Sequence, residues 1–171
     1  MDYAEAAAYW TERETEAGRM EREELLAEVE SFIAAHKTCA LATAGLDGFV
    51  RCTPLEYNWL DGAFWMFSEG GLKFRALESN KNVCLAIYEP YEGFGKLNSM
   101  QVEGRAEIVE PWSDEYLALL AHKGIPEESL RKLPTVMNLI KVVPASIDFL
   151  CSALKERGFD SRQHVELGGQ A

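Results

Sequence analysis

The side chains with the clearest chemical potential lie in and near the segment FSEGGLK, residues 67–73. A strand-like run ends there at Ser68, two glycines follow, and Lys73 begins a short helix-compatible stretch. Arg51, in an earlier strand-like run, can bind a phosphate through two donors, while a lysine acts as a point charge. A serine hydroxyl and the amides of a glycine loop can supply further donors. The combination predicts a phosphate-binding site, called here the phosphate seat, made of Arg51, Ser68, the Gly70-Gly71 backbone and Lys73. The alternative is an ordinary strand-to-helix turn with solvated cations.

No other group of residues in the sequence predicts a binding or catalytic site. The GFGK segment at residues 93–96 lacks the frame of a phosphate-binding P-loop, because Leu97 stands where a hydroxyl is required. The cysteines are widely spaced in apolar stretches, which is typical of free thiols in a reducing compartment, and the histidines are isolated. We therefore predict no metal site. The residues considered are Cys39, Cys52, Cys84, Cys151, His36, His122 and His164.

The elements that must position the phosphate seat follow from the hydrophobic pattern. Apolar residues recur at helical spacing in residues 22–36, and Ser113 is placed to cap a helix that runs to His122. Asp61-Gly62 predicts a tight hairpin turn, and residues 73–79 predict a short helix. The predicted strands are residues 38–43, 49–59, 63–68, 83–88 and 99–109, followed by a pair within residues 137–151 that is broken at Pro144.

These elements predict a mainly β fold with flanking helices, a small β-barrel. We predict an acidic helical leader over residues 1–21 and a single domain over residues 22–171. Residues 1–30 hold ten acidic and three basic residues and so carry −7 of the net charge of −11. The sequence shows neither a basic stripe nor a membrane-spanning or signal segment. We therefore expect a cytoplasmic protein that binds neither nucleic acid nor membranes.

The order of these features resembles the pyridoxamine 5′-phosphate oxidase-like family of FMN-binding split β-barrels. The resemblance runs from about Glu24 to Glu110, and it rests on the spacing of Lys73, Asn80, Val83 and the segment Gly104-Arg105-Ala106. It implies a split-barrel fold and a homodimer with a flavin at each subunit interface. FMN is the implied cofactor, with a deazaflavin or haem as the alternatives.

The resemblance also implies individual site residues. Arg51 matches the strand arginine at the flavin phosphate, and Lys73 matches the lysine at the start of the helix. Phe67 and Ser68 match the end of the next strand, where backbone and hydroxyl meet the flavin. Ser99 falls where a side chain reaches the ring from the partner subunit, unless Asn98 or Gln101 takes that role. The full set of implied cofactor-binding residues is Arg51, Cys52, Thr53, Phe67, Ser68, Lys73 and Ser99.

Two departures from the family pattern bear on the reaction. Glu56 stands where true pyridoxamine 5′-phosphate oxidases carry a lysine for the substrate phosphate, and the segment after Lys155 does not resemble their substrate-binding tail. We therefore expect an FMN-dependent oxidoreductase that acts on another small organic substrate. The alternative is a non-catalytic flavin or haem binder of the same fold. The sequence names no catalytic acid or base.

Overall fold

The computed structural model describes residues 2–3, 5 and 18–168 of the 171-residue chain. Most of the predicted acidic leader therefore lies outside the described residues. The strands of the described part are β1 (Thr38–Ala44), β2 (Val50–Glu56), β3 (Asn58–Leu60), β4 (Ala63–Ser68), β5 (Asn82–Tyr88), β6 (Asn98–Val109), β7 (Asn138–Cys151) and β8 (Arg162–Glu166). The α-helices are α2 (Arg22–Ala35), α3 (Lys73–Ser79), α4 (Asp114–Lys123) and α5 (Glu127–Arg131).

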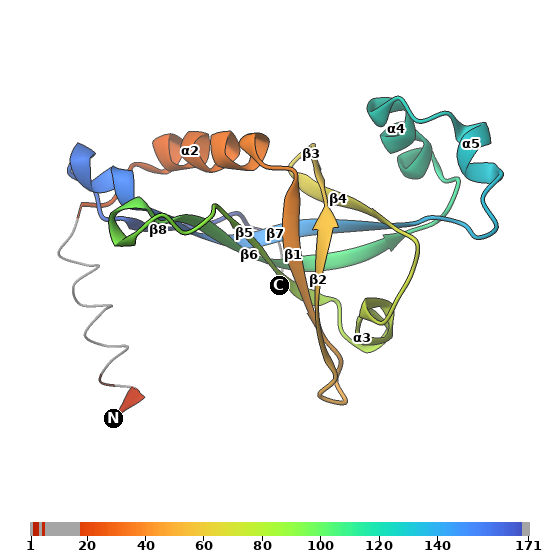
Figure 1. Ribbon diagram of the computed structural model, residues 1–171, viewed down its shortest axis with the longest axis horizontal. Helices are drawn as coiled ribbons and strands as arrows, with labels where there is room; N and C mark the ends of the chain where they lie inside the picture. The colour runs from red at the N-terminus through yellow and green to blue at the C-terminus, as the bar shows by residue number, and fades with distance from the viewer. Residues whose placement is uncertain (1, 4, 6–17, 169–171) are drawn as a thin grey trace.

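All eight strands join one antiparallel sheet in the order β2-β1-β5-β6-β7-β4-β3, with β8 paired to the outer part of β7. The sheet curls so that β2, at one end of this order, approaches β4, the strand next to the other end. Helix α2 covers one face, α3 lies beyond the end of β4, and α4 and α5 form one end of the molecule (Figure 1). The predicted mainly β fold with flanking helices is confirmed.

The core lies inside the curl, where side chains of alternate strand residues meet helix α2. Leu41, Leu85 and Val102 are fully buried in the sheet, and Ile33 packs on them from the helix. A second, smaller cluster lies on the other face of β4, where Trp65 meets the α4–α5 end. Strand β4 thus has apolar residues on both faces, which explains its continuous apolar sequence.

The hairpin at Asp61-Gly62 is confirmed, since both residues have positive φ, 52° and 72°, as a type I′ turn requires. The strand predicted over residues 49–59 is instead two strands, β2 and β3, separated at Tyr57. Tyr57 is buried and its hydroxyl donates to the carbonyl of Ile33 in α2, at 2.8 Å. This anchor turns the chain from pairing with β1 to pairing with β4.

The strand break predicted at Pro144 is wrong, because β7 runs unbroken from Asn138 to Cys151. The pairing of β6 with β7 shifts between Glu103 and Gly104, and Gly104 then faces Pro144. The shift leaves Ala145 without a partner on β6, so the strand accommodates a proline that has no N–H to donate. A β-carbon on Gly104 would lie only 2.5 Å from the carbonyl oxygen of Val143.

This close approach makes Gly104→Ala a test of the sheet's curvature. We expect the substitution to lower the free energy of unfolding by about 1–3 kcal/mol, because backbone atoms must move to accept the methyl group. Gly95→Ala is the matched control, since nothing lies within 4 Å of its β-carbon position. Urea denaturation of both variants measures the difference, and equal stabilities would show that the close approach is unimportant.

Candidate functional site

The predicted phosphate seat lies where β4 ends and α3 begins. Gly70 and Gly71 have φ values of 145° and 105°, which side chains with a β-carbon rarely adopt, so glycines are needed here. The buried hydroxyl of Ser68 lies 3.2 Å from the Gly70 carbonyl oxygen and 3.3 Å from the Gly70 amide nitrogen. The loop therefore folds back on the last residue of the strand and brings Lys73 beside it.

Lys73 is a buried cation with only 5% of its surface exposed. Its ammonium donates to the carbonyl of Gly70 and lies 5.1 Å from the ring centroid of Phe74. Lysine is rarely buried without a counter-charge, because removing the charged form from water is costly. Among the described residues, Lys73 forms no salt bridge with a carboxylate, and Glu69 in the same loop is exposed.

Arg51 supplies a second positive charge to the same place. It lies on β2, opposite the buried Thr43 of β1, and its own charge acts on Lys73. The pKa of Lys73 is lowered, first by burial and then by the charge of Arg51. Arg51 likewise forms no salt bridge with a carboxylate in the described part of the chain. Two neighbouring cations that repel each other are what an anion would stabilise.

The structure thus brings together Arg51, Ser68 and Lys73, by a route that the sequence did not predict. Arg51 and Ser68 do not meet through the Asp61-Gly62 hairpin, because β2 pairs with β1 and only β3 pairs with β4. They meet because the sheet curls and α3 packs against β1 and β2.

Other predicted cofactor-binding residues lie around this centre. Thr53 is opposite Leu41, so it shares the inner face of β2 with Arg51, whereas Cys52 is exposed on the outer face. The side chain of Phe67 points to the other face of β4 from Ser68 and packs edge-on against Tyr116, with ring centroids 5.4 Å apart. Only the backbone of Phe67 is therefore available on the side of the seat.

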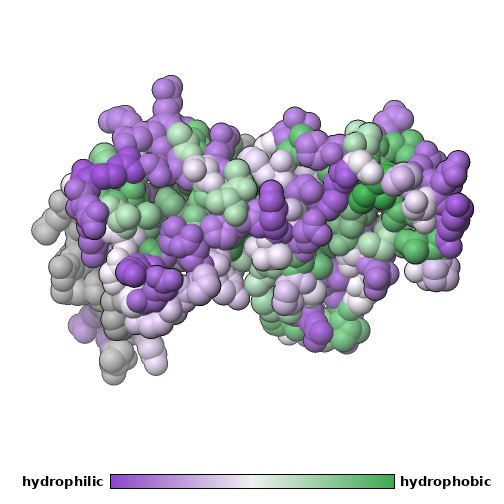
Figure 2. Space-filling model, turned by 45° about the horizontal axis from the view of Figure 1, so that its top comes forward, coloured by the Kyte–Doolittle hydropathy of each residue, from purple (hydrophilic) through white to green (hydrophobic). Residues whose placement is uncertain are grey.

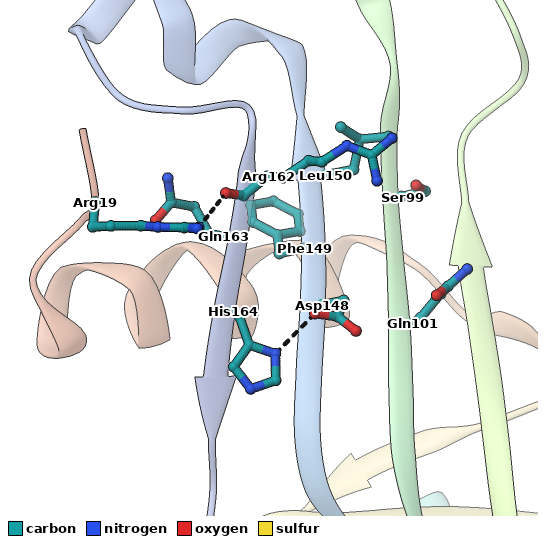
Figure 3. Close-up of a pocket in the computed structure, with 9 residues that line it drawn as sticks. All are labelled: Arg19, Ser99, Gln101, Asp148, Phe149, Leu150, Arg162, Gln163 and His164. Atoms are coloured by element: carbon teal, nitrogen blue, oxygen red, sulfur yellow. Dashed lines mark hydrogen bonds and ion pairs between the residues drawn. The ribbon is translucent and has the colours of Figure 1, made fainter. Parts of the chain in front are cut away.

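Ser99 lies far from the seat within one chain. It is five residues along β6 from Gly104, which belongs to the same row across the sheet as Arg51, so the offset along the strand is about 17 Å. Ser99 lines a separate cavity of about 280 Å³ on the outer face of β6, β7 and β8 (Figure 3). Ser99 therefore makes no contact with Arg51, Ser68 or Lys73 within one chain.

His164 is a titratable residue that lines the same cavity as Ser99 (Figure 3). Its Nδ1 lies 2.8 Å from Asp148 Oδ1 on β7, and its Nε2 lies 3.0 Å from Glu166 Oε1 on its own strand. The pKa of His164 is raised, chiefly by the hydrogen bond to Asp148 and then by that to Glu166. Strand β8, which holds this histidine, was missed in the sequence because it is short and its outward residues are polar.

Sequence reasoning also missed three polar contacts made by residues of β4, α3 and β2. Asn138 donates from Nδ2 to the carbonyl of Ser68 at 3.3 Å. Arg75, two residues after Lys73, pairs with Asp47 at 2.8 Å. Glu56 pairs with Lys123 of α4, also at 2.8 Å. No local sequence pattern links these partners, since each contact joins residues at least 28 positions apart.

Comparison with known proteins bears on the identity of this site. Residues 25–151, well over half of the chain, match the family model of pyridoxamine 5′-phosphate oxidase. The chain belongs to this family. The match includes Arg51, Ser68 and Lys73, and it ends before β8, so the His164 cavity is only partly inside it.

Solved structures support the split-barrel fold of this family member. The haem storage protein HutZ of Vibrio cholerae is 19% identical over 74% of this chain and 91% of that one, with a TM-score of 0.59. An FAD-binding protein of Mesorhizobium loti is 21% identical over 71% and 89%, with a TM-score of 0.58. A Clostridium acetobutylicum protein of the pyridoxinephosphate oxidase family is 15% identical over 86% and 97%, with a TM-score of 0.57.

At these identities the likeness shows the fold alone, and the predicted split β-barrel is confirmed. No curated protein sequence matches the chain. Within the described residues, no helix is both long and apolar enough to cross a bilayer, and no cluster of metal-ligating side chains is present.

The His164 contacts predict a pH dependence of stability. In the folded protein the pKa of His164 lies above the ordinary value of 6.5. The stability that its two carboxylate contacts contribute is therefore complete below pH 6.5 and is lost as pH rises through the raised pKa. We expect wild type to exceed His164→Gln in unfolding free energy by up to about 1 kcal/mol at pH 6, and by less at alkaline pH. Urea titrations across pH measure this, with His122→Gln as the control. A difference between wild type and His164→Gln that does not change with pH would contradict a stabilising role of the charged His164.

Proposed function

We propose that this protein binds FMN and uses it as an oxidoreductase of a small organic substrate. The observation that carries the proposal is a buried lysine, Lys73, beside Arg51, with no salt bridge from either to a carboxylate of the described residues. A phosphomonoester carries up to two negative charges and fits this deficit. The residues present therefore fit a flavin phosphate, and they give no comparable reason to bind an uncharged end of a ligand.

Each residue of the seat has a distinct task in this proposal. Arg51 offers two parallel donors from the edge of β2, and Lys73 offers a single charge from the base of the site. Ser68 and the glycine amides add neutral donors, and Asn138 holds the end of β4 in place through its bond to Ser68. A bound flavin supplies two-electron redox chemistry, while the protein binds and orients it.

We further propose that the active form is a homodimer with a flavin at each interface. The outer face of β1 and β5 carries small side chains, and a shallow cavity of about 430 Å³ opens there between Ala42, Val50 and Cys84. Val50 is 68% exposed, as a residue at an uncovered apolar surface would be. Apolar side chains also gather over the α4–α5 end (Figure 2). A partner on the outer face would bring a second Ser99 toward the seat.

The state of Glu56 bears on the substrate. Its carboxylate is 64% exposed and pairs with Lys123, which is 18% exposed. The pair presents no net positive charge to a ligand, so we propose a substrate other than pyridoxamine 5′-phosphate. The family membership supports flavin chemistry in general, and Glu56 is the residue that separates this chain from the oxidases of vitamin B6.

Haem binding is the second candidate function, and His164 is the observation that favours it. This histidine lines a cavity together with Leu150 and Arg162, so an apolar ring and an anionic group could both find partners there. Both ring nitrogens already contact carboxylates, so iron could bind only after Asp148 or Glu166 moved away. The visible spectrum of purified protein separates the candidates, since flavin and haem absorb differently.

The phosphate seat predicts a difference between FMN and riboflavin. Lys73→Ala and Arg51→Ala should each weaken FMN binding by about ten- to a thousandfold, at about 1.4 kcal/mol per tenfold, and leave riboflavin binding nearly unchanged. Titration of apoprotein with both ligands, followed by flavin fluorescence, measures this. Lys155→Ala, an exposed lysine outside the seat, is the control.

Lys73→Met separates a binding role from a structural role. We expect the apoprotein's unfolding free energy to be unchanged or raised, because an apolar chain replaces a buried cation repelled by Arg51. If Lys73 instead stabilised the fold, Lys73→Met would lower the unfolding free energy. Unchanged FMN affinity in all three variants would refute the seat.

The homodimer has its own test in light scattering of the flavin-loaded protein. We expect twice the 19.2 kDa chain mass at micromolar concentration, because the interface would bury apolar surface from both copies. Val50→Glu, which places a charge on the outer face, should shift the mass toward a monomer and lower the flavin content. A loaded wild-type monomer would contradict the proposal.

A further inference from the structure

A group of charged side chains on the outer face of the sheet has no role in the phosphate seat. His164 of β8 lies between two carboxylates, Asp148 of β7 at 2.8 Å and Glu166 of β8 at 3.0 Å. Figure 3 shows the contact with Asp148. The side chains of His164, Asp148 and Glu166 are 47%, 58% and 73% exposed. In a single chain they therefore lie largely in water, which keeps their ion pairs weak.

The register of the sheet shows that this group belongs to a larger uncovered face. His164 lies opposite Asp148, Asp148 opposite Gln101 of β6, Gln101 opposite Ala86 of β5, and Ala86 opposite Ala40 of β1. Residues directly opposite each other on neighbouring strands share one face of the sheet. None of these five residues is buried, whereas α2 packs on the core at the other face. The row thus joins the charged group to the small side chains of β1 and β5.

The proposed homodimer brings this face against a second copy. Ser99, which the dimer would bring toward the partner's seat, lines the same cavity as Asp148 and His164 (Figure 3). A partner close enough to meet Ser99 therefore also displaces water from the two carboxylates of the charged group. The remaining charges then interact more strongly, and a charge without a partner becomes more costly.

His164 is the only cation that forms an ion pair with either carboxylate in the described part of the chain. Two arginines near the start of α2 donate instead to backbone carbonyls of β8. They are Arg19, which donates to the carbonyl of Arg162 at 2.8 Å, and Arg22, which donates to that of Glu166 at 2.7 Å. Loss of the proton from His164 therefore leaves Asp148 and Glu166 charged and without an ion-pair partner.

The row of residues next to His164 adds one more carboxylate. Glu103 of β6 and Glu166 both lie opposite Ser146 of β7, so they share the outer face. Cys84 of β5 lies opposite Glu103. Burial, then Glu103 and more weakly Asp148, raise the pKa of the Cys84 thiol above its ordinary value of 9.0, so this thiol stays neutral below pH 9.0.

We propose that the charge of His164 governs the association of two copies, so that the homodimer is tighter in mildly acidic than in alkaline solution. The inference rests on the proposed homodimer and adds a means of regulating it. A protonated His164 enters the interface between two carboxylates that stabilise it. A neutral His164 instead leaves both carboxylates to be desolvated without compensation.

The direction of the pH dependence follows from the protonation of His164. The pKa of His164 is already raised in one chain, first by the hydrogen bond to Asp148 and then by that to Glu166. We expect the interface to raise this pKa further, because less water screens the two carboxylates. The gain in affinity is then complete below the pKa of the single chain and is lost as pH rises through that of the dimer. This window begins above 6.5, the ordinary value for histidine.

Sedimentation equilibrium of the flavin-loaded protein at about pH 6 and about pH 8.5 measures the dissociation constant of the dimer. We expect the wild-type constant to rise by about five- to thirtyfold with pH, because each dimer holds two copies of His164 and its carboxylates. His164→Gln, which cannot titrate, should change by less than about twofold. The phosphate of the flavin also titrates at about pH 6, but it does so in both proteins and cancels in their comparison.

Asp148→Asn combined with Glu166→Gln tests the same idea from the side of the carboxylates. Both amides keep an acceptor for the histidine ring, but neither stabilises its charge. The dimer of this variant should no longer weaken as pH rises. His122→Gln is the control, because His122 is an exposed histidine of α4, and it should keep the wild-type dependence. Circular dichroism at both pH values checks that each variant is folded.

The outcomes separate this inference from the proposed function. A wild-type protein that is monomeric at both pH values contradicts the homodimer itself. A wild-type dimer with the same affinity at both pH values leaves the homodimer in place and refutes only the role of His164. The inference is also overturned if His164→Gln, or the variant without the two carboxylates, keeps the wild-type dependence on pH.

Discussion

The burial of one lysine charge next to a second cation is the constraint on which this site depends. Lys73 has a single carbonyl partner, and Arg51 repels it, so the local arrangement is less stable than an apolar alternative would be. Such an arrangement persists only because the rest of the fold over-determines it. The two glycines of the loop and the packing of α3 against β1 and β2 hold Lys73 in this place.

The curl itself depends on a contact far from the cations. Gly104 lets β6 approach β7 at Pro144, and Ala145, which has no partner on β6, makes a bulge that bends the long central strands. The bend brings β2, at one end of the hydrogen-bonded order, close to β4, the last strand but one at the other end. A site built where two such strands meet needs no deep pocket in a single chain, because a partner or a ligand can form its remaining wall.

The sequence predicted best those elements whose ends depend on neighbouring residues. Strand β4 and helix α3 begin and end where the apolar pattern, the Asp61-Gly62 turn and the glycine pair placed them. The break at Tyr57 depends on a hydrogen bond to Ile33, and the continuity of β7 through Pro144 depends on a glycine forty residues earlier. Neither partner can be recognised from the residues around the break, so both outcomes differed from the prediction.

The residues of the candidate site also fall into those that local sequence indicates and those that depend on distant partners. Arg51, Ser68 and Lys73 were identified because each residue type suits a phosphate and sits at the end or edge of a predicted element. Asp47 and Glu56 have partners on helices α3 and α4 that only the tertiary fold supplies. Most residues of the proposed phosphate seat therefore lie in one short segment of the sequence, whereas the ion pairs of Asp47 and Glu56 depend on the packing of distant elements.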